Sequence, residues 1–164
     1  MEEVYVKKIK DIKKNKDEVE RKLNVKLTIV GNKISYEGDS IDEYEASLVF
    51  EAISFGFSVR VALNLKIEEN TFKVVHIKDH TKRKLKDIKS RLIGTQGKTR
   101  RIISDISNCY VLINESDVGI IGYVEDVENA STAIISLIKG SKQANMYQYL
   151  ERMNRTKKEE DFKI

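Results

Sequence analysis

The sequence predicts an α+β protein built from two similar units, and two observations support this. Sliding the 164-residue chain against itself by 84 residues aligns Gly38 with Gly122 and Gly56 with Gly140. The order strand, helix, helix, strand, strand, helix can also be read twice from hydrophobic periodicity and turn residues. No stretch rich in Pro, Gly or Ser separates the copies near residues 67–71. We therefore expect the two units to pack together.

The first unit, residues 1–68, shows clear turn and helix signals. The expected elements are a strand at Val4–Val6, a helix at Asp17–Leu23, strands at Lys26–Val30 and Lys33–Glu37, and helices at Ser40–Phe55 and Ser58–Leu65. The Gly31–Asn32 pair is typical of a hairpin turn. Ser40 and Glu43 predict a capping box, and Gly56 ends the long helix. That helix carries an apolar stripe, which predicts its core face: Ile41, Tyr44, Leu48, Ala52 and Phe55.

The second unit, residues 69–153, repeats the same order of elements. We expect strands at Thr71–Lys78, Cys109–Asn114 and Val118–Gly122, and helices at Thr81–Leu92, Lys98–Asn108, Val124–Lys139 and Asn145–Met153. Residues 154–164 are almost all charged, which predicts a disordered tail. The first helix of this unit has apolar residues at spacings of three and four, namely Leu85, Ile88 and Leu92.

A glycine turn, Ile93-Gly94-Thr95-Gln96-Gly97, joins the first two helices of the second unit. Two glycines three apart permit a sharp turn and let another backbone come close, because no Cβ stands in the way. The amides that open the following helix carry the positive end of its dipole and suit a phosphate. Full charges follow directly at Lys98, Arg100 and Arg101. The pattern indicates an anion-binding turn.

The distribution of charge also favours a polyanion partner. Ten Lys or Arg and only two Asp lie between residues 78 and 101, in a chain whose net charge is +4. A local surplus of this size indicates nucleic acid. A solvated basic helix–turn–helix without a ligand is the plain alternative.

The Gly-x-x-Gly turn between two helices resembles the KH domain, which binds single-stranded nucleic acid and whose GXXG loop clamps about four nucleotides. The repeated element order is that of a type I KH fold, a three-stranded antiparallel sheet with helices on one face. Most KH domains have an aliphatic residue where this chain has Arg100. With the run Gly97–Ile103, that difference resembles the archaeal ribosome-biogenesis KH proteins akin to the eukaryotic partner of the Nob-one nuclease.

The resemblance implies an RNA-binding protein that acts near the 3′ end of small-subunit rRNA. It also implies work beside a PIN-domain endonuclease and contact with the alpha subunit of the archaeal initiation factor. The single cysteine and the lack of a signal-peptide pattern predict a cytoplasmic location. The expected RNA site is Arg91, Ile93, Gly94, Thr95, Gln96, Gly97, Lys98, Arg100 and Arg101. Ile103 and Ile113 belong either to the floor of the RNA groove, with Ile93, or to the core.

The first unit lacks the loop glycines. In the 84-residue register, Lys10 and Lys13 take the places of Gly94 and Gly97. Side chains at these positions block close approach of a phosphate. We therefore expect a degenerate KH unit that serves packing or protein contacts, although its lysines could hold RNA loosely.

Other functions remain as alternatives to rRNA binding. Gly97-Lys98-Thr99 also ends a nucleotide-binding P-loop, but that motif needs a glycine at position 92, which is Leu, and a strand before the loop. A generic RNA chaperone would use the same loop, and a protein-binding scaffold would leave it idle. We expect no catalytic set, cofactor or metal: His76 and His80 lack a Cys partner, and Cys109 heads an apolar run as a small buried residue. Nor do we expect a signal peptide or a membrane span.

Overall fold

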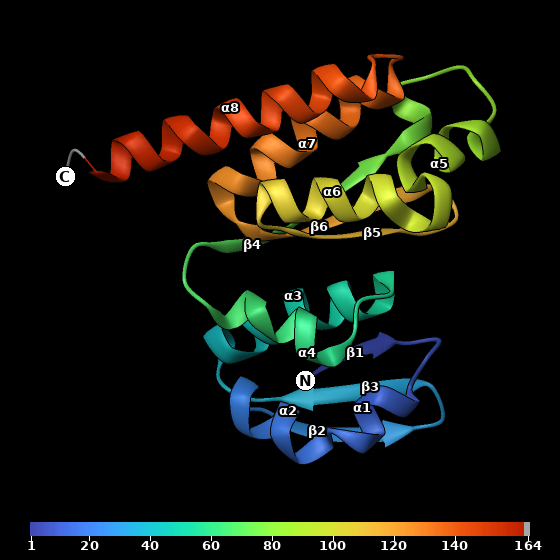
Figure 1. Ribbon diagram of the computed structural model, residues 1–164. Coiled ribbons are helices and arrows are strands. Elements are labelled where there is room, and N and C mark those ends of the chain that lie inside the picture. Colours follow the sequence, from blue (N-terminus) through green and yellow to red (C-terminus); the bar gives the residue numbers. More distant parts are fainter. Residues whose placement is uncertain (163–164) are drawn as a thin grey trace. The chain divides into compact units, whose positions relative to one another are not determined.

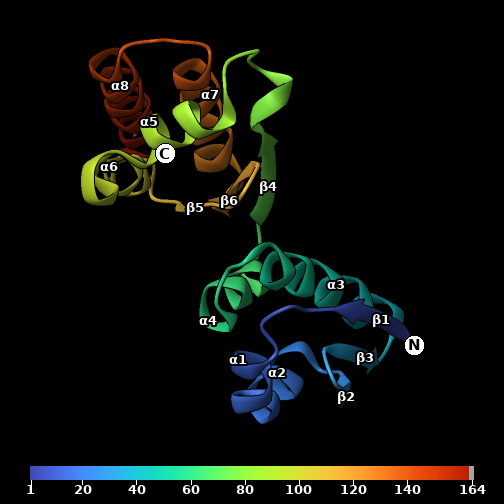
Figure 2. The ribbon, with the colours of Figure 1, turned by 90° about the vertical axis from the view of Figure 1, so that its right-hand side faces the viewer.

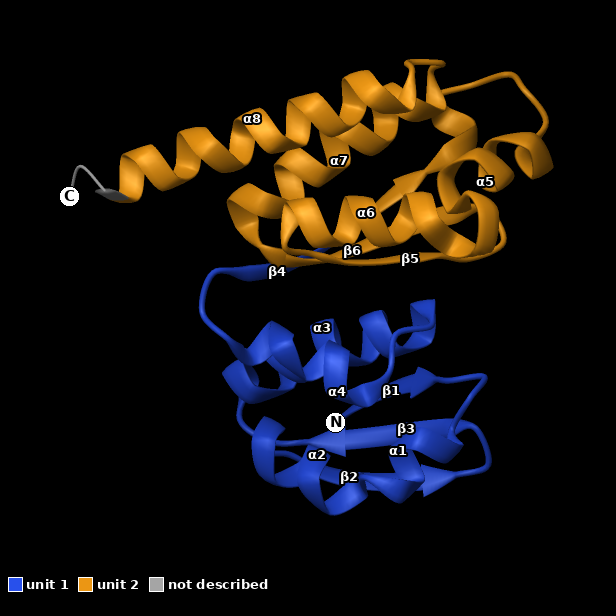
Figure 3. Ribbon diagram, viewed as in Figure 1, with its two compact units in different colours: residues 1–72 blue, residues 73–164 orange. Residues whose placement is uncertain are grey.

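The computed structural model describes residues 1–162 and divides into two compact units, Met1–Phe72 and Lys73–Ile164 (Figure 3). The division falls inside strand β4 (Asn70–His76), slightly beyond the expected boundary at residue 68. Each unit contains one three-stranded antiparallel sheet with helices (Figure 1). The predicted α+β class is confirmed. The packing of the two units against each other stays a prediction.

Unit 1 has the sheet order β1-β3-β2. Its elements are β1 (Glu2–Tyr5), α1 (Lys10–Lys14), α2 (Lys16–Leu23), β2 (Lys26–Val30), β3 (Lys33–Glu37), α3 (Ser40–Phe55), α4 (Val59–Ala62) and the 3-10 helix η1 (Leu63–Lys66). Strands β2 and β3 pair antiparallel with Val30 opposite Lys33, and Gly31 has a φ of 61°, as a tight hairpin requires. The rings of Tyr36 and Phe50 lie 5.0 Å apart in the core.

Helix α3 buries a face that differs in part from the predicted one: Ala52 is buried as expected, and Leu48 and Phe55 are partly buried. Ile41 is 73% exposed and Tyr44 is 65% exposed. The buried residues are Ala46, Val49, Phe50, Ala52 and Ile53. Apolar residues occupy more than one side of this helix, so periodicity alone did not select the core face. The predicted capping box is also wrong, because Glu43 Oε1 accepts a hydrogen bond from the Gly38 N–H at 3.2 Å.

Unit 2 has the sheet order β4-β6-β5, and its helices gather on one side of this sheet (Figure 2). After β4 come the 3-10 helix η2 (Ile77–Asp79), α5 (Leu85–Ile93), the 3-10 turn η3 (Thr95–Gly97), α6 (Lys98–Ser107), β5 (Tyr110–Ile113), β6 (Asp117–Tyr123), α7 (Val124–Ile138) and α8 (Gln143–Phe162). Helix α5 starts four residues later than expected, after a turn in which Thr81 Oγ1 accepts from the Arg83 N–H. Ile88 and Leu92 are buried and Leu85 packs against the core, as the spacing predicted.

Helix α8 continues well beyond Met153, where we expected a disordered tail. Lys157 Nζ lies 2.9 Å from Asp126 Oδ1 on α7 and 4.7 Å from the centre of the Tyr123 ring. Burial opposes the charge on Lys157, but the hydrogen bond and negative charge of Asp126 outweigh it, so the pKa of Lys157 is raised. The sequence did not reveal this long-range pair. Residues 163–164 of the expected tail lie outside the described residues.

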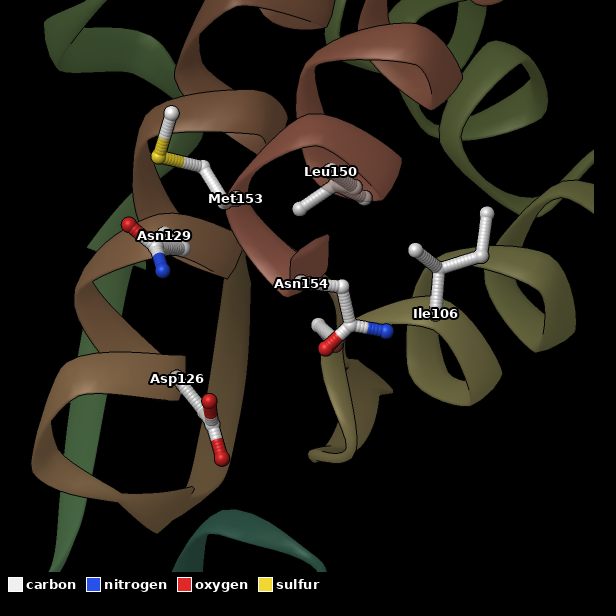
Figure 4. Close-up of a pocket in the computed structure, with 7 residues that line it drawn as sticks. Ile106, Asp126, Asn129, Leu150, Met153 and Asn154 are labelled. Carbon is white, nitrogen blue, oxygen red and sulfur yellow. The ribbon is translucent and has the colours of Figure 1, made fainter. Parts of the chain in front are cut away.

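The same region shows how α6, α7 and α8 meet. Ile106 from α6, Asp126 and Asn129 from α7, and Leu150 and Asn154 from α8 surround a cavity of about 10 Å³ (Figure 4). This is room for about one water molecule. The three helices are therefore closely packed where α6, which follows the α5–α6 turn, meets α7 and α8.

Candidate nucleic-acid interface

Gly94 closes the end of α5 in a conformation that only glycine adopts readily. Its φ is 74° and its ψ is 177°, a region that is almost exclusive to glycine. A Cβ at this position would lie 2.8 Å from the Thr99 Cβ. Gly94 is therefore required by the packing of the protein itself.

Gly97 differs from Gly94 because the space around it is empty. Its φ is 76°, yet no atom lies within 4 Å of the place where its Cβ would be. The neighbouring Gln96 also has a positive φ, 54°, and the side chains of Thr95 and Gln96 are exposed. The turn thus leaves open space on the Cβ side of Gly97, whose own N–H donates to the Gly94 carbonyl oxygen at 3.2 Å.

The start of α6 leaves its first amides without a side-chain cap. Gly97 is the N-cap residue and no side chain accepts a hydrogen bond there. The positive end of the helix dipole adds to the charge of Lys98, which is exposed. Because helix α5, and not a strand, precedes this turn, the P-loop interpretation is wrong.

The four predicted cations fall into two pairs. Lys98 and Arg101 are exposed, and Arg101 Nη2 donates to the Gln96 carbonyl oxygen at 3.3 Å, which holds its charge beside the turn. Arg91 and Arg100 are partly buried. Arg91 Nη2 donates to the Ser141 carbonyl oxygen, and Arg100 Nη1 donates to the Val111 carbonyl oxygen of β5 at 3.2 Å. The second pair therefore holds structure together as well as adding charge.

The three isoleucines also separate. Ile103 is 1% exposed and belongs to the core cluster, so the core is confirmed as the correct one of the two alternatives that the sequence left open for it. Ile93 and Ile113 are partly buried, and Ile113 packs against the same core. The sequence held no clear signal for Ile103, because its buried neighbours on the same helix face, Thr99 and Ser107, are polar.

Sequence reasoning missed Thr99, which supports the turn from inside. Its side chain lies against Gly94, and its Oγ1 accepts a hydrogen bond from Gln143 Nε2 at 3.2 Å. Thr99 is 4% exposed. One hydroxyl thus joins the turn to the first residue of α8.

In unit 1 the corresponding connection is closed. Helices α1 and α2 are separated only by Asn15, whose Nδ2 donates to the Asp11 carbonyl oxygen at 2.8 Å and to Asp11 Oδ1 at 3.0 Å. Asp11 Oδ2 in turn accepts from the Val59 N–H at 2.8 Å. Lys10 and Lys13 lie within α1 and not in a loop, so the register that set them against the glycines is wrong at this point.

The remaining titratable candidates have structural partners. His76 Nδ1 lies 2.8 Å from Asp117 Oδ1, and this hydrogen bond raises the pKa of His76. His80 follows the 3-10 turn η2. Among the described residues no three His, Cys, Asp or Glu side chains are grouped so as to hold a metal ion. Burial raises the pKa of the Cys109 thiol to about 12, and Cys109 is 4% exposed, the buried position that was predicted.

None of the helices in residues 1–162 is long and apolar enough to cross a membrane.

Comparison with known proteins agrees with this geometry. The family model of the second PNO1-type KH domain, described as a eukaryotic type KH-domain (KH-domain type I), matches residues 71–155. The KH domain-containing protein MJ0443 of Methanocaldococcus jannaschii is 30% identical over 159 residues, which are 91% of this chain and 69% of that protein. The RNA-binding protein pno-1 of Caenorhabditis elegans is 27% identical over 124 residues, which are 70% of this chain and 43% of the worm protein.

A solved structure extends the likeness to nearly the whole chain. A chain in the crystal structure of the a/eIF2alpha–aDim2p–rRNA complex from Pyrococcus horikoshii OT3 superposes with a TM-score of 0.83 at 29% identity. The match covers 94% of this chain and 94% of that one. The family model spans more than half of the sequence and contains the whole GXXG turn. The chain therefore belongs to the PNO1-type family of type I KH proteins.

Proposed function

We propose that this protein binds single-stranded RNA at the 3′ end of small-subunit rRNA during ribosome biogenesis. The observation that carries the proposal is the turn at Gly94–Gly97. It presents open space on the Cβ side of Gly97, an uncapped helix start and the exposed cations Lys98 and Arg101. These are the groups that a KH loop uses on a nucleic-acid backbone. The relatives are named as RNA-binding or occur in a complex with rRNA, which supports this ligand.

The site residues have distinct roles in this proposal. Gly94 shapes the turn, Gly97 admits the phosphate, and Thr95 and Gln96 flank it. Lys98 and Arg101 neutralise phosphates, while Arg91 and Arg100 add charge from positions fixed by their carbonyl acceptors. Ile93 is partly buried at the end of α5, and its apolar side chain contacts the RNA strand. Unit 1 acts as a degenerate KH unit without a loop and serves packing or protein contacts.

The proposed protein partners rest on the relatives. A structural relative was solved together with a/eIF2alpha and rRNA, so we propose that the initiation factor alpha subunit binds this chain too. Work beside a PIN-domain rRNA endonuclease follows from the family resemblance alone. The proposal places the protein in the cytoplasm and assigns it no catalytic activity. It predicts no turnover of ATP or GTP by the pure protein.

The test is to crosslink the protein to RNA in cells and to sequence the attached RNA. We expect reads concentrated at the 3′ end of small-subunit rRNA, and we expect the variant Thr95→Asp/Gln96→Asp to lose them. Reads spread over many RNA classes would indicate a general RNA chaperone instead. Recovery of no RNA above background would leave the protein-binding scaffold as the better function.

A further inference from the structure

A groove of about 470 Å³ lies beside the glycine turn, on the side that faces α8. Its wall is formed by the end of α5, the turn, the first two turns of α6 and the start of α8. The residues that line it are Ser90, Arg91, Gly94, Thr95, Lys98, Thr99, Ile102, Gln143 and Tyr147. Helix α6 contacts β5 on one side and α8 on another. The groove is therefore separate from the surface between α6 and β5.

Two hydrogen bonds join the walls of this groove. Arg91 on α5 donates to the Ser141 carbonyl oxygen just before α8, and Gln143 at the start of α8 donates to Thr99 Oγ1. Met146 and Leu150 on the following turns of α8 are each 2% exposed. The start of α8 is thus attached to α5 and α6 by hydrogen bonds and to the core by Met146 and Leu150.

The chemistry of the lining points to one class of ligand. Both ionic groups, Arg91 and Lys98, are cations, and none of the described lining residues is acidic. The partly buried ring of Tyr147 and the side chain of Ile102 supply apolar surface. The Gln143 amide can pair with the edge of a base. A cation for a phosphate, an aromatic ring for stacking and an amide for an edge are what a nucleotide requires.

The position of the groove identifies where such a nucleotide would come from. Gly94, Thr95 and Lys98 belong both to the groove and to the turn that we assign to the RNA backbone. A phosphate held at Lys98 would therefore have a base within reach of Tyr147. We propose that this groove binds one nucleotide of the RNA strand that crosses Gly94–Gly97, with its base against the Tyr147 ring. This inference rests on the proposed function.

The test replaces the aromatic ring while keeping apolar packing. We expect Tyr147→Leu to weaken binding of a single-stranded RNA of about eight nucleotides by about fivefold or more, the lower end of what one base–aromatic stack contributes. Tyr147→Phe keeps the ring and should bind like the wild type. Tyr149→Leu is the matched control, because Tyr149 lies two residues further on the same helix and does not line the groove. Thermal melting checks that all three variants fold.

A crosslink provides a second readout that does not depend on stability. RNA of the same length carrying 4-thiouridine should crosslink to the peptide that contains Tyr147. If the wild type binds RNA, the loop variant Thr95→Asp/Gln96→Asp loses it and Tyr147→Leu binds normally, the groove is overturned and the proposed function stands. Adducts confined to α6 and β5 would overturn the groove as well. If the wild type binds no single-stranded RNA, both proposals fall.

Discussion

The two units connect their first pair of helices in opposite ways. In unit 2, the residues Thr95–Gly97 form a 3-10 turn between α5 and α6, and the space on the Cβ side of Gly97 is open. In unit 1, the single residue Asn15 with a φ of −111° separates α1 from α2, and its side chain ties the connection to Asp11. The same place in the fold is open in one unit and closed in the other.

The difference shows that positive charge alone does not make the site. The stretch Lys7–Lys16 contains six lysines and one aspartate, Asp11. The Asp11 carboxylate accepts hydrogen bonds from the Asn15 side chain and the Val59 N–H. Unit 1 therefore offers as many cations near its helix connection as unit 2 does near the turn. What it lacks is a turn whose backbone a phosphate can approach. We therefore expect tight RNA binding to follow the glycines and not the lysines.

The largest expected effect separates the two glycines of the turn. Gly94→Ala should lower the free energy of unfolding by about 3 kcal/mol, because of its disallowed backbone conformation and the contact with Thr99. Gly97→Ala should cost only about 1 kcal/mol, since it meets no atom within 4 Å. Urea denaturation of both variants measures this. Equal losses of unfolding free energy in the two variants would show that the fold does not depend more on Gly94 than on Gly97.

The next effect is on RNA affinity. Thr95→Asp/Gln96→Asp places two carboxylates where the phosphate belongs and should weaken binding tenfold or more, about 1.4 kcal/mol. The melting temperature should stay near that of the wild type, because both side chains are exposed and precede a helix start that favours negative charge. Fluorescence anisotropy with labelled RNA gives the affinity. The control is Lys13→Asp/Lys14→Asp in unit 1. An equal loss of RNA affinity in this control would show that the lysines of unit 1 matter as much as the turn of unit 2.

A third variant tests the closed connection. Asn15→Ala removes two hydrogen bonds to Asp11 and should lower the free energy of unfolding by about 1 kcal/mol. RNA affinity should not change. Asn32→Ala is a suitable control, because it keeps the backbone hydrogen bond from the Val6 N–H and removes an exposed 3.4 Å hydrogen bond from the Asn32 side chain to the Tyr5 hydroxyl. A loss of RNA binding in Asn15→Ala with an intact fold would mean that unit 1 takes part in binding the RNA.

The smallest effect concerns the salt dependence of binding. Lys98→Ala removes an exposed cation beside the turn and should reduce the slope of log affinity against log salt by about 0.7. Arg100→Ala should leave the slope nearly unchanged, since Arg100 is half-buried and donates to the Val111 carbonyl oxygen. Titrations at several salt concentrations decide this. Equal slope changes would show that Arg100 reaches a phosphate despite that hydrogen bond.

The features that local signals determine were predictable from the sequence. The Gly31 turn, the end of α3 at Gly56 and the Gly94–Gly97 turn between two helices all appear where the residues placed them. Each depends on a backbone conformation that glycine provides within a few residues. The order of elements and the α+β class followed from such local signals, whereas the family followed from the resemblance carried by the GXXG turn and the run Gly97–Ile103.

Features that depend on distant partners were not predictable. The core face of α3 was predicted only in part, because that helix is apolar on more than one side. Packing against the rest of the unit decides which side is buried. Arg91 and Arg100 look alike in the sequence as free cations, yet their acceptors lie 50 and 11 residues away. The groove beside the turn needs α8, whose attachment through Gln143 spans 44 residues.

The attachment of α8 also sets how short unit 2 can be made. Asp126 is 7% exposed, and Lys157 is the cation that neutralises it. A chain cut after Met153 would lose this ion pair and also Asn154, which lies beside Asp126, so we expect the shortened unit to be less stable than the full one. A protease that trims the C-terminus past Lys157 would remove the same ion pair. The charged end of the sequence is therefore part of the folded unit, and the stable limit of the unit lies beyond Lys157.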